Sequence, residues 1–284
     1  MPTIPPGRPA PSGSDSSFRQ YAESFGTDAE RYERARPRYP EALLERVIAS
    51  SPSPSPGSGP GPDILDVGCG TGIAARQFQA LGGRVLGVEP DARMAEVARR
   101  FGVEVETAAF EGWDAGGREF DVVVAGQAWH WIDPVAGAAK AAEVLRPGGL
   151  LAAFWNVFRL PPELADACGD AYRRAVPDSP FDLRAALSQD TDPYQEILTR
   201  AADGIQRTGA FGAAERWRFD WEHLCTKDAW LDQLPTLGIL TRLPPDQLAP
   251  VLEAAGDAVD AAGGSFTMRY ATVAVGASRT GAAT

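Results

Sequence analysis

The sequence predicts an α/β fold built on a mostly parallel sheet. Between residues 63 and 155, short apolar segments typical of buried strands alternate with segments of helical period. Such alternation implies right-handed crossovers between parallel neighbours. A turn with three glycines, GCGTG at 68–72, joins the first strand to the first helix. Glycines are needed there because the chain turns tightly and a ligand must approach the backbone closely.

The N-terminal part is predicted to hold two helices between two unstructured stretches. Residues 1–17 are mostly Pro, Gly and Ser, and they cannot bury enough apolar surface to offset the entropy of ordering. Residues 18–50 read as helices broken by Pro37 and Pro40. Residues 51–62, SPSPSPGSGPGP, read as an exposed linker.

The core domain is expected at 63–158. Its predicted helices run from the glycine turn to about 81, over 91–101 and over 134–145, where Arg-Pro-Gly-Gly ends the last one. The valine-rich segment FDVVVAG suits a strand buried on both faces. The predicted strands are 63–67, 84–88, 103–107, 120–126 and 150–155.

The remaining chain is predicted to complete the sheet and to add a helical cap. Residues 159–214 are helical without a strand pattern, and we expect them to form a lid over the substrate together with 227–243 and the N-terminal helices. In the segment 215–279, residues 215–224 and 265–277 alternate apolar and polar side chains, as strands do. We therefore expect one sheet domain with a cap rather than two independent domains.

Composition excludes several classes of function. The formal net charge of −11 disfavours non-specific binding to nucleic acids or anionic membranes, because phosphate repels the chain. Three scattered cysteines and two histidines are too few for a disulfide framework or a His-rich metal site, so we expect no metal. The longest apolar runs are too short to span a bilayer, and the first residues lack a signal-peptide core. We expect a soluble cytoplasmic protein, a monomer or a homodimer.

The glycine pattern discriminates between ligands. A dinucleotide fold spaces its glycines G-x-G-x-x-G, whereas Gly68, Gly70 and Gly72 follow G-x-G-x-G. Asp66, just before the turn, would repel a pyrophosphate and suits a ligand with a positively charged amino group. Glu89 ends the second strand, where its carboxylate can accept hydrogen bonds from both hydroxyls of a ribose.

Four segments resemble motifs of the class I S-adenosylmethionine (SAM)-dependent methyltransferases, specifically of a bacterial small-molecule branch. They are DVGCGTG, GVEPDARM, FDVVVAGQAWHWIDP and LRPGGLLAAFWN, in the family's order, and RYERARPRYP precedes them. The resemblance implies a Rossmann-like, seven-stranded, mostly parallel sheet with helices on both faces. It also implies SAM as the cofactor.

The resemblance assigns cofactor contacts residue by residue. It places the methionine part of SAM on Asp66 and the glycine turn, and the ribose on Glu89. Arg36 would pair with the SAM carboxylate, the alternative being a solvated charge at a helix end, and Tyr32 would cover the cofactor. Many relatives carry an Asp where this chain has Ala109, so Glu111 is the nearest substitute for contacting the adenine amino group. The further expected adenine contacts are Pro90, Met94 and the Phe110 backbone amide.

The groups for the reaction are expected after the fourth and fifth strands, because ligands of open α/β sheets bind beyond the carboxyl ends of the strands. His130 has a suitable ordinary pKa for a general base. The alternative is that WHW packs and covers the cofactor, with His130 only hydrogen bonding. Gln127 is expected to contact the cofactor. Trp129 and Trp131 would form an aromatic wall on the substrate side, and Trp155 and Asn156 would also contact the substrate.

The sequence thus predicts an enzyme that transfers the SAM methyl group to a small molecule, with secondary metabolism as the expected setting. The sulfonium already activates the methyl group, so the protein must chiefly align a nucleophile. Whether the acceptor atom is O, N or C stays open. Two alternatives are a non-catalytic SAM-fold binding module and an NAD-dependent oxidoreductase.

Overall fold

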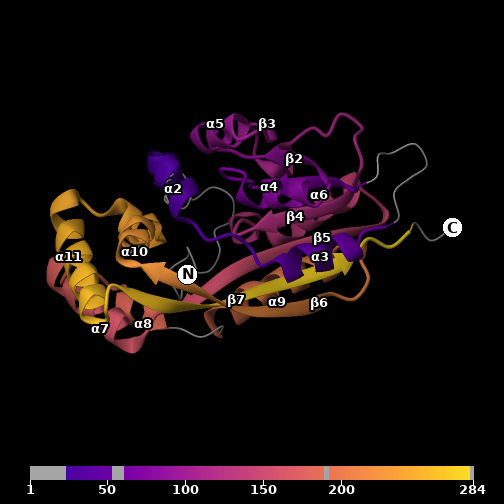
Figure 1. Cartoon of the computed structure of the whole chain (residues 1–284). Coiled ribbons are helices and arrows are strands. Elements are labelled where there is room, and N and C mark those ends of the chain that lie inside the picture. The colour runs from indigo at the N-terminus through magenta and orange to yellow at the C-terminus, as the bar shows by residue number, and fades with distance from the viewer. Residues whose placement is uncertain (1–23, 53–60, 189–191, 282–284) are drawn as a thin grey trace. The chain divides into compact units, whose positions relative to one another are not determined.

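The computed structural model describes residues 24–52, 61–188 and 192–281 (Figure 1). The predicted tail at 1–17 and most of the predicted linker at 51–62 lie outside these residues. Seven strands form one sheet in the order β3-β2-β1-β4-β5-β7-β6. The pairs β3–β2, β2–β1, β1–β4 and β4–β5 are parallel. The predicted Rossmann-like α/β fold is confirmed, while the capping role of the other helices stays a prediction.

Most predicted elements appear within a few residues of their expected bounds. The strands are β1 (Asp63–Val67), β2 (Arg84–Val88), β3 (Glu104–Glu106), β4 (Phe120–Gly126), β5 (Leu145–Arg159), β6 (Glu215–Thr226) and β7 (Ser265–Ser278). The longer helices are α2 (Ala29–Ala35), α3 (Glu41–Ala49), α4 (Ile73–Ala80), α5 (Ala92–Arg100), α6 (Pro134–Val144), α7 (Pro162–Ala175), α8 (Leu183–Ser188), α9 (Asp192–Arg207), α10 (Lys227–Gln233) and α11 (Pro245–Ala261).

Strand β5 is much longer than the predicted 150–155. The Arg-Pro-Gly-Gly segment, expected only to end a helix, is extended and belongs to the strand. Backbone hydrogen bonds explain this, because Gly148 donates to the Arg279 carbonyl and the Arg279 N–H donates to Gly149. The register with β4 shifts between Phe120 and Val122, which accommodates the glycines.

The segment 227–243 is a continuous helix only as far as Gln233. Two short 3₁₀ helices follow, η4 (Leu234–Thr236) and η5 (Gly238–Arg242). Pro235 lacks the backbone N–H that a continuing α-helix would use. The other predicted helical region, 160–214, is confirmed as helical by α7, α8 and α9.

The chain divides into two compact units. Unit 1 comprises residues 1–37, 156–194 and 220–271, and unit 2 comprises 38–155, 195–219 and 272–284. Strands β5, β6 and β7 each have residues in both units.

Unit 2 contains the glycine turn and the parallel strands. Its central strands β1 and β4 are buried on both faces, which confirms the expectation from the valine run. At their amino ends, Arg146 donates to the carboxylates of Asp121 (2.7 Å) and Asp63 (3.0 Å). Asp121 is buried and also accepts the Asp63 backbone N–H at 2.8 Å. Since removing one partner of a buried ion pair is costly, Arg146 is important to this end of the sheet.

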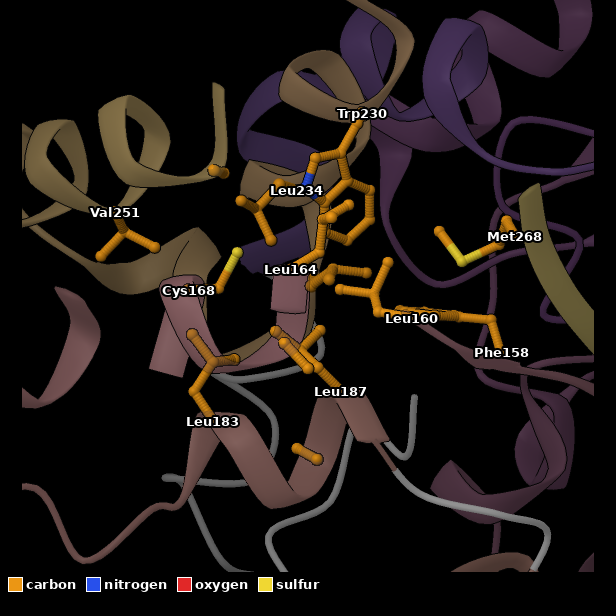
Figure 2. Packing of buried hydrophobic residues seen from close by; sticks show 14 of the residues in the cluster. Phe158, Leu160, Leu164, Cys168, Leu183, Leu187, Trp230, Leu234, Val251 and Met268 are labelled. Carbon is orange, nitrogen blue, oxygen red and sulfur yellow. The ribbon is translucent and has the colours of Figure 1, made fainter. Parts of the chain in front are cut away.

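Unit 1 has an apolar core of its own, formed by α7, α8, α10 and α11 with the ends of β5, β6 and β7. Figure 1 shows α7 and α11 side by side. Figure 2 shows the core, in which the fully buried Trp230 lies among leucines such as Leu164 and Leu234. The Trp230 ring meets the rings of Phe158 and Phe266 edge to face, with centroids 6.2 and 6.0 Å apart.

Candidate functional site

The glycine turn has the backbone conformation that its sequence requires. Gly68, Gly70 and Gly72 have φ values of 64°, 56° and 81°, in the left-handed region that side chains with a Cβ rarely adopt. A Cβ on Gly68 would lie 2.6 Å from the Cβ of Ala128, so this residue also lacks room for a side chain. Gly72 caps the amino end of α4, and the N–H of Arg76 donates to its carbonyl at 3.0 Å.

Glu89 stands at the carboxyl end of β2 and is held by the turn. Its Oε2 accepts the Gly70 N–H and its Oε1 accepts the Asp91 N–H, both at 2.9 Å. The side chain is buried, and this burial raises the pKa of Glu89 to about 7 despite the two N–H donors. Each carboxylate oxygen has a second lone pair, so the group can also accept hydrogen bonds from a pair of hydroxyls.

Asp66 lies in β1 just before the turn and is almost completely buried. Burial, with a smaller contribution from the Glu89 charge, raises its pKa to about 8, although an Ala75 backbone N–H donates to it. Its Oδ2 has no hydrogen-bond partner in the described part of the chain. An unpartnered buried carboxyl group is costly, and a ligand cation would relieve that cost.

The predicted adenine contacts lie on the two helices that follow β2 and β3, or, for Pro90, in the loop before the first of them. Met94 on α5 is buried, and its Cε lies 3.5 Å from the position of a Cβ on Gly70. Phe110 is buried at the start of a 3₁₀ helix, whereas Pro90 is exposed. Glu111 is exposed and accepts the Asp133 N–H at 3.3 Å, which gives it a partner beside α6.

The carboxyl end of β4 carries the segment of predicted catalytic residues. Gln127 has a φ of 57°, which is unusual for a residue other than glycine. Its backbone N–H donates to the Phe154 carbonyl of β5 at 2.8 Å. The residues Trp129–Trp131 form a 3₁₀ helix in which Trp129 and His130 are buried and Trp131 is partly exposed. A positive φ such as that of Gln127 is a form of backbone strain that is often found at functional sites.

His130 is held by Trp155 of β5. The indole Nε1 of Trp155 donates to the His130 Nδ1 at 3.0 Å. Burial lowers the pKa of His130 to about 3, and Arg200 of α9 acts in the same direction. The imidazole is therefore neutral at physiological pH. The general-base role stays a prediction, and these two observations weigh against it.

Three predicted site residues belong to unit 1. The Arg36 guanidinium lies over the ring of Tyr32, 4.8 Å from its centroid, and donates to the Thr236 carbonyl. Asn156 is buried. Their roles toward cofactor and substrate stay predictions.

Sequence reasoning assigned Trp155 a substrate contact and gave no sign of its bond to His130. The two residues are 25 positions apart, and only the pairing of β4 with β5 brings them together.

No group of His, Cys, Asp and Glu side chains suited to a metal occurs within the described ranges. In those same ranges, no helix is both long enough and apolar enough to cross a bilayer.

A sequence model described as "methyltransferase domain" matches residues 65–153. The chain is 27% identical over 220 residues to an uncharacterised methyltransferase of Mycobacterium bovis, covering 76% of this chain and 77% of the relative. A solved structure of a proposed type II methyltransferase from Anaeromyxobacter dehalogenans has 25% identity and a TM-score of 0.59, covering 85% of this chain and 97% of that one. Together these similarities support a class I SAM-dependent methyltransferase.

These similarities favour one of the three functions left open by the sequence. The chain is an enzyme, a SAM-dependent methyltransferase. Further similarities are partial. A ubiquinone biosynthesis O-methyltransferase of Methylocella silvestris is 35% identical over 95 residues, which is 31% of this methyltransferase and 37% of the relative. A Haemonchus contortus phosphoethanolamine N-methyltransferase, solved with phosphomonomethylethanolamine and S-adenosylhomocysteine, shares the fold at 15% identity and a TM-score of 0.51, covering 93% and 60%.

Proposed function

We propose that this enzyme transfers the methyl group of SAM to a small organic molecule. The observation that carries the proposal is the pair of buried carboxyl groups, Asp66 and Glu89, at the carboxyl ends of adjacent strands around the glycine turn. The acidic charge of the chain favours a small molecule over a nucleic acid. The ubiquinone biosynthesis O-methyltransferases among its relatives support an organic acceptor.

The residues present fit SAM. The unpartnered Oδ2 of Asp66 would accept the ammonium group of its methionine part. The second lone pairs of the Glu89 oxygens would accept the ribose hydroxyls, and the three glycines of the turn have no Cβ atoms to block the approach. Met94, Pro90, Phe110 and Glu111 would surround the adenine, and Gln127 would complete the cofactor site. When bound, SAM supplies a methyl group that its sulfonium already activates.

The chain's own contribution to the reaction is positioning and exclusion of water. Holding the reactants in line contributes about 7–11 kcal/mol to such a step. Trp129 is buried, and its Nε1 has no hydrogen-bond partner among the described residues. We propose that Trp129 and Trp131 form an aromatic wall beside the acceptor. The roles of Tyr32, Arg36 and Asn156, the helical lid, the cytoplasmic location and the oligomeric state stay predictions.

Calorimetric titration with S-adenosylhomocysteine tests the cofactor site. Glu89→Gln replaces one accepting oxygen by an NH₂ group that opposes a backbone N–H, so we expect affinity to fall about 10- to 100-fold. Glu119→Gln, an exposed change in unit 2, is the matched control and is expected to bind as the wild type does. Equal affinity of Glu89→Gln and wild type would contradict the proposed site.

Labelled methyl transfer tests the acceptor class. The enzyme is incubated with methyl-labelled SAM and a pooled bacterial extract, divided into small molecules, RNA and protein. We expect label only in the small-molecule fraction, with a mass gain of one methyl group on the product. Label confined to RNA or protein would refute a small-molecule acceptor.

A further inference from the structure

Strand β6 is the outermost strand at one edge of the sheet. In the strand order it follows β7, and no strand of the described residues lies beyond it. It runs without interruption from Glu215 to Thr226, so the extended backbone fixes the spacing of its side chains. The outer N–H and C=O groups of an edge strand are a template for pairing with another strand, and natural edge strands are therefore often short. With 12 residues, β6 is long enough to pair.

One face of β6 is aromatic and packs within the chain. Trp217 and Trp221 are half-buried on this face. A Cβ on Gly276 of β7 would stand 2.6 Å from the Trp217 ring, so this ring lies directly on the neighbouring strand. The Trp221 ring stacks on that of Tyr270, also in β7, with centroids 4.1 Å apart and 8° between the planes.

The opposite face of β6, which we call the charged face, is exposed along its length. It carries Arg216, Arg218, Asp220 and Glu222 in this order, followed by Leu224, whose exposed fraction is 64%. Two positive charges thus precede two negative ones. A face with charges of one sign would repel a second copy of itself, whereas this face has opposite signs at its two ends.

The pleat of the strand limits how β6 can pair with a copy of itself. Side chains directly opposite each other in an antiparallel pair point to the same face, so a two-fold axis must pass through a residue. With Phe219 on the axis, Arg216 lies opposite Glu222 of the other copy. Arg218 then lies opposite Asp220, so each of these pairs joins opposite charges.

Neighbouring registers lack this match. An axis through Arg218 or Asp220 places that residue opposite itself, and like charges directly opposite each other are destabilising. The charges therefore favour the register centred on Phe219. This preference needs only the sign of each charge, whatever contacts the side chain makes within its own chain.

We propose that β6 pairs with β6 of a second copy of this chain, antiparallel and centred on Phe219, and that this pairing forms a homodimer. Backbone hydrogen bonds between the two edges supply the attraction, and the charged face sets the register. An interface of one strand pair is small, so the dissociation constant is expected to be on the order of 10 µM.

The contacts of the charged face within the chain are of a kind that exchanges easily. Arg216 donates to Gln195 Oε1 at 3.2 Å and to Thr199 Oγ1 at 2.9 Å, both on α9. The Nε of Arg269 lies 3.3 Å from Glu222 Oε1, and both side chains are mostly exposed. Exposed contacts of this kind contribute little to stability, so the side chains can also meet an opposite charge across a strand pair.

Sedimentation equilibrium of the full-length protein, from about 1 to 200 µM, tests the pairing without any activity. Arg216→Glu places two acidic side chains opposite each other at both ends of the strand pair, so we expect the dissociation constant to rise at least about tenfold. Arg174→Glu, an exposed change of the same charge on α7, is the matched control and should dimerise as the wild type does.

The double variant Arg216→Glu/Glu222→Arg restores opposite signs across the pair. We expect its dissociation constant to return to within about threefold of the wild type. This variant also lacks the Arg216 contacts with α9, so its recovery can come only from the cross-strand pair. A wild type that stays monomeric at 200 µM, or a double variant that dimerises as weakly as Arg216→Glu, would overturn the proposal.

A distance between spin labels tests the register. Leu224→Cys introduces an exposed thiol that can be labelled selectively, because the three native cysteines are buried. With Phe219 on the axis, position 224 lies opposite position 214, so the two labels are separated by about 34 Å along the strands. Moving the axis by one residue changes this distance by about 7 Å. Double electron–electron resonance that gives a distance of another register, or no distance in a dimeric sample, would overturn the proposed pairing.

Discussion

Replacing Asp66 by Asn is predicted to stabilise the free enzyme while it weakens cofactor binding. The carboxyl group is almost completely buried, and burial raises its pKa from the ordinary 3.8 to about 8. A raised carboxyl pKa means that the folded state binds a proton that the unfolded state releases. Relative to high pH, the free energy of unfolding contains a contribution from this proton that is fully present below about pH 3.8 and is lost as the pH rises toward 8.

The magnitude follows from the pKa difference. About three pH units separate pH 7 from the ordinary pKa of 3.8, and each unit corresponds to about 1.4 kcal/mol. The carboxyl group of Asp66 therefore lowers the free energy of unfolding at pH 7 by up to about 4 kcal/mol, and at pH 5 by about 1.6 kcal/mol. Asn is nearly isosteric and carries no charge, so Asp66→Asn removes this cost.

Urea unfolding of wild type and variant at pH 5 and pH 7 measures the effect. We expect Asp66→Asn to be more stable than the wild type at both pH values, with the larger gain at pH 7. Asp203→Asn, an exposed change on α9, is the control and is expected to alter stability by less than about 0.5 kcal/mol. A variant less stable than the wild type, or a gain that does not grow with pH, would refute the reasoning.

The same carboxyl group predicts the pH dependence of cofactor binding. An ammonium group favours the ionised form of Asp66, which the free enzyme populates only as the pH approaches 8. Wild-type affinity for S-adenosylhomocysteine should therefore rise from pH 6 to pH 8, by at most about tenfold per unit. In Asp66→Asn the affinity should be lower and should lose this slope. Calorimetry across this range would contradict the assignment if wild type and variant showed the same slope.

Three further substitutions test the packing of the two units. Gly116→Ala should destabilise the enzyme by about 1–2 kcal/mol, because φ is positive there but the space around it is open. Gly68→Ala should destabilise it by more, because φ is positive and there is also no room for a Cβ. Denaturant unfolding of the two variants makes the comparison. Arg146→Leu leaves Asp121 as a buried, unpaired charge and should cost about 3–5 kcal/mol by the same measurement. Trp230→Ala should cost about 3–5 kcal/mol and lower the melting temperature, and a change below 1 kcal/mol would contradict its place in the core.

Local chemistry explains why so much of the cofactor site was predictable from the sequence. The three glycines must adopt positive φ, and a strand, a tight turn and a helix are recognisable from neighbouring residues alone. Parallel strands place their carboxyl ends at one edge of a sheet, which is why Asp66 and Glu89 could be expected together. The length of β5 was not predictable, because its glycines belong to the strand only through hydrogen bonds with residue 279.

The sequence by itself determined the fold class, the methyltransferase family and the carboxyl groups that suit SAM, since each depends on short-range patterns. Only the tertiary structure decided what those groups do electrostatically, because burial is a property of the folded chain. Burial makes Asp66 and Glu89 weak acids, and the indole of Trp155, distant in sequence, donates to Nδ1 of His130. The histidine that the sequence suggests as a base, from its place after the fourth strand, thus has a lowered pKa and an occupied Nδ1, which only the folded chain reveals.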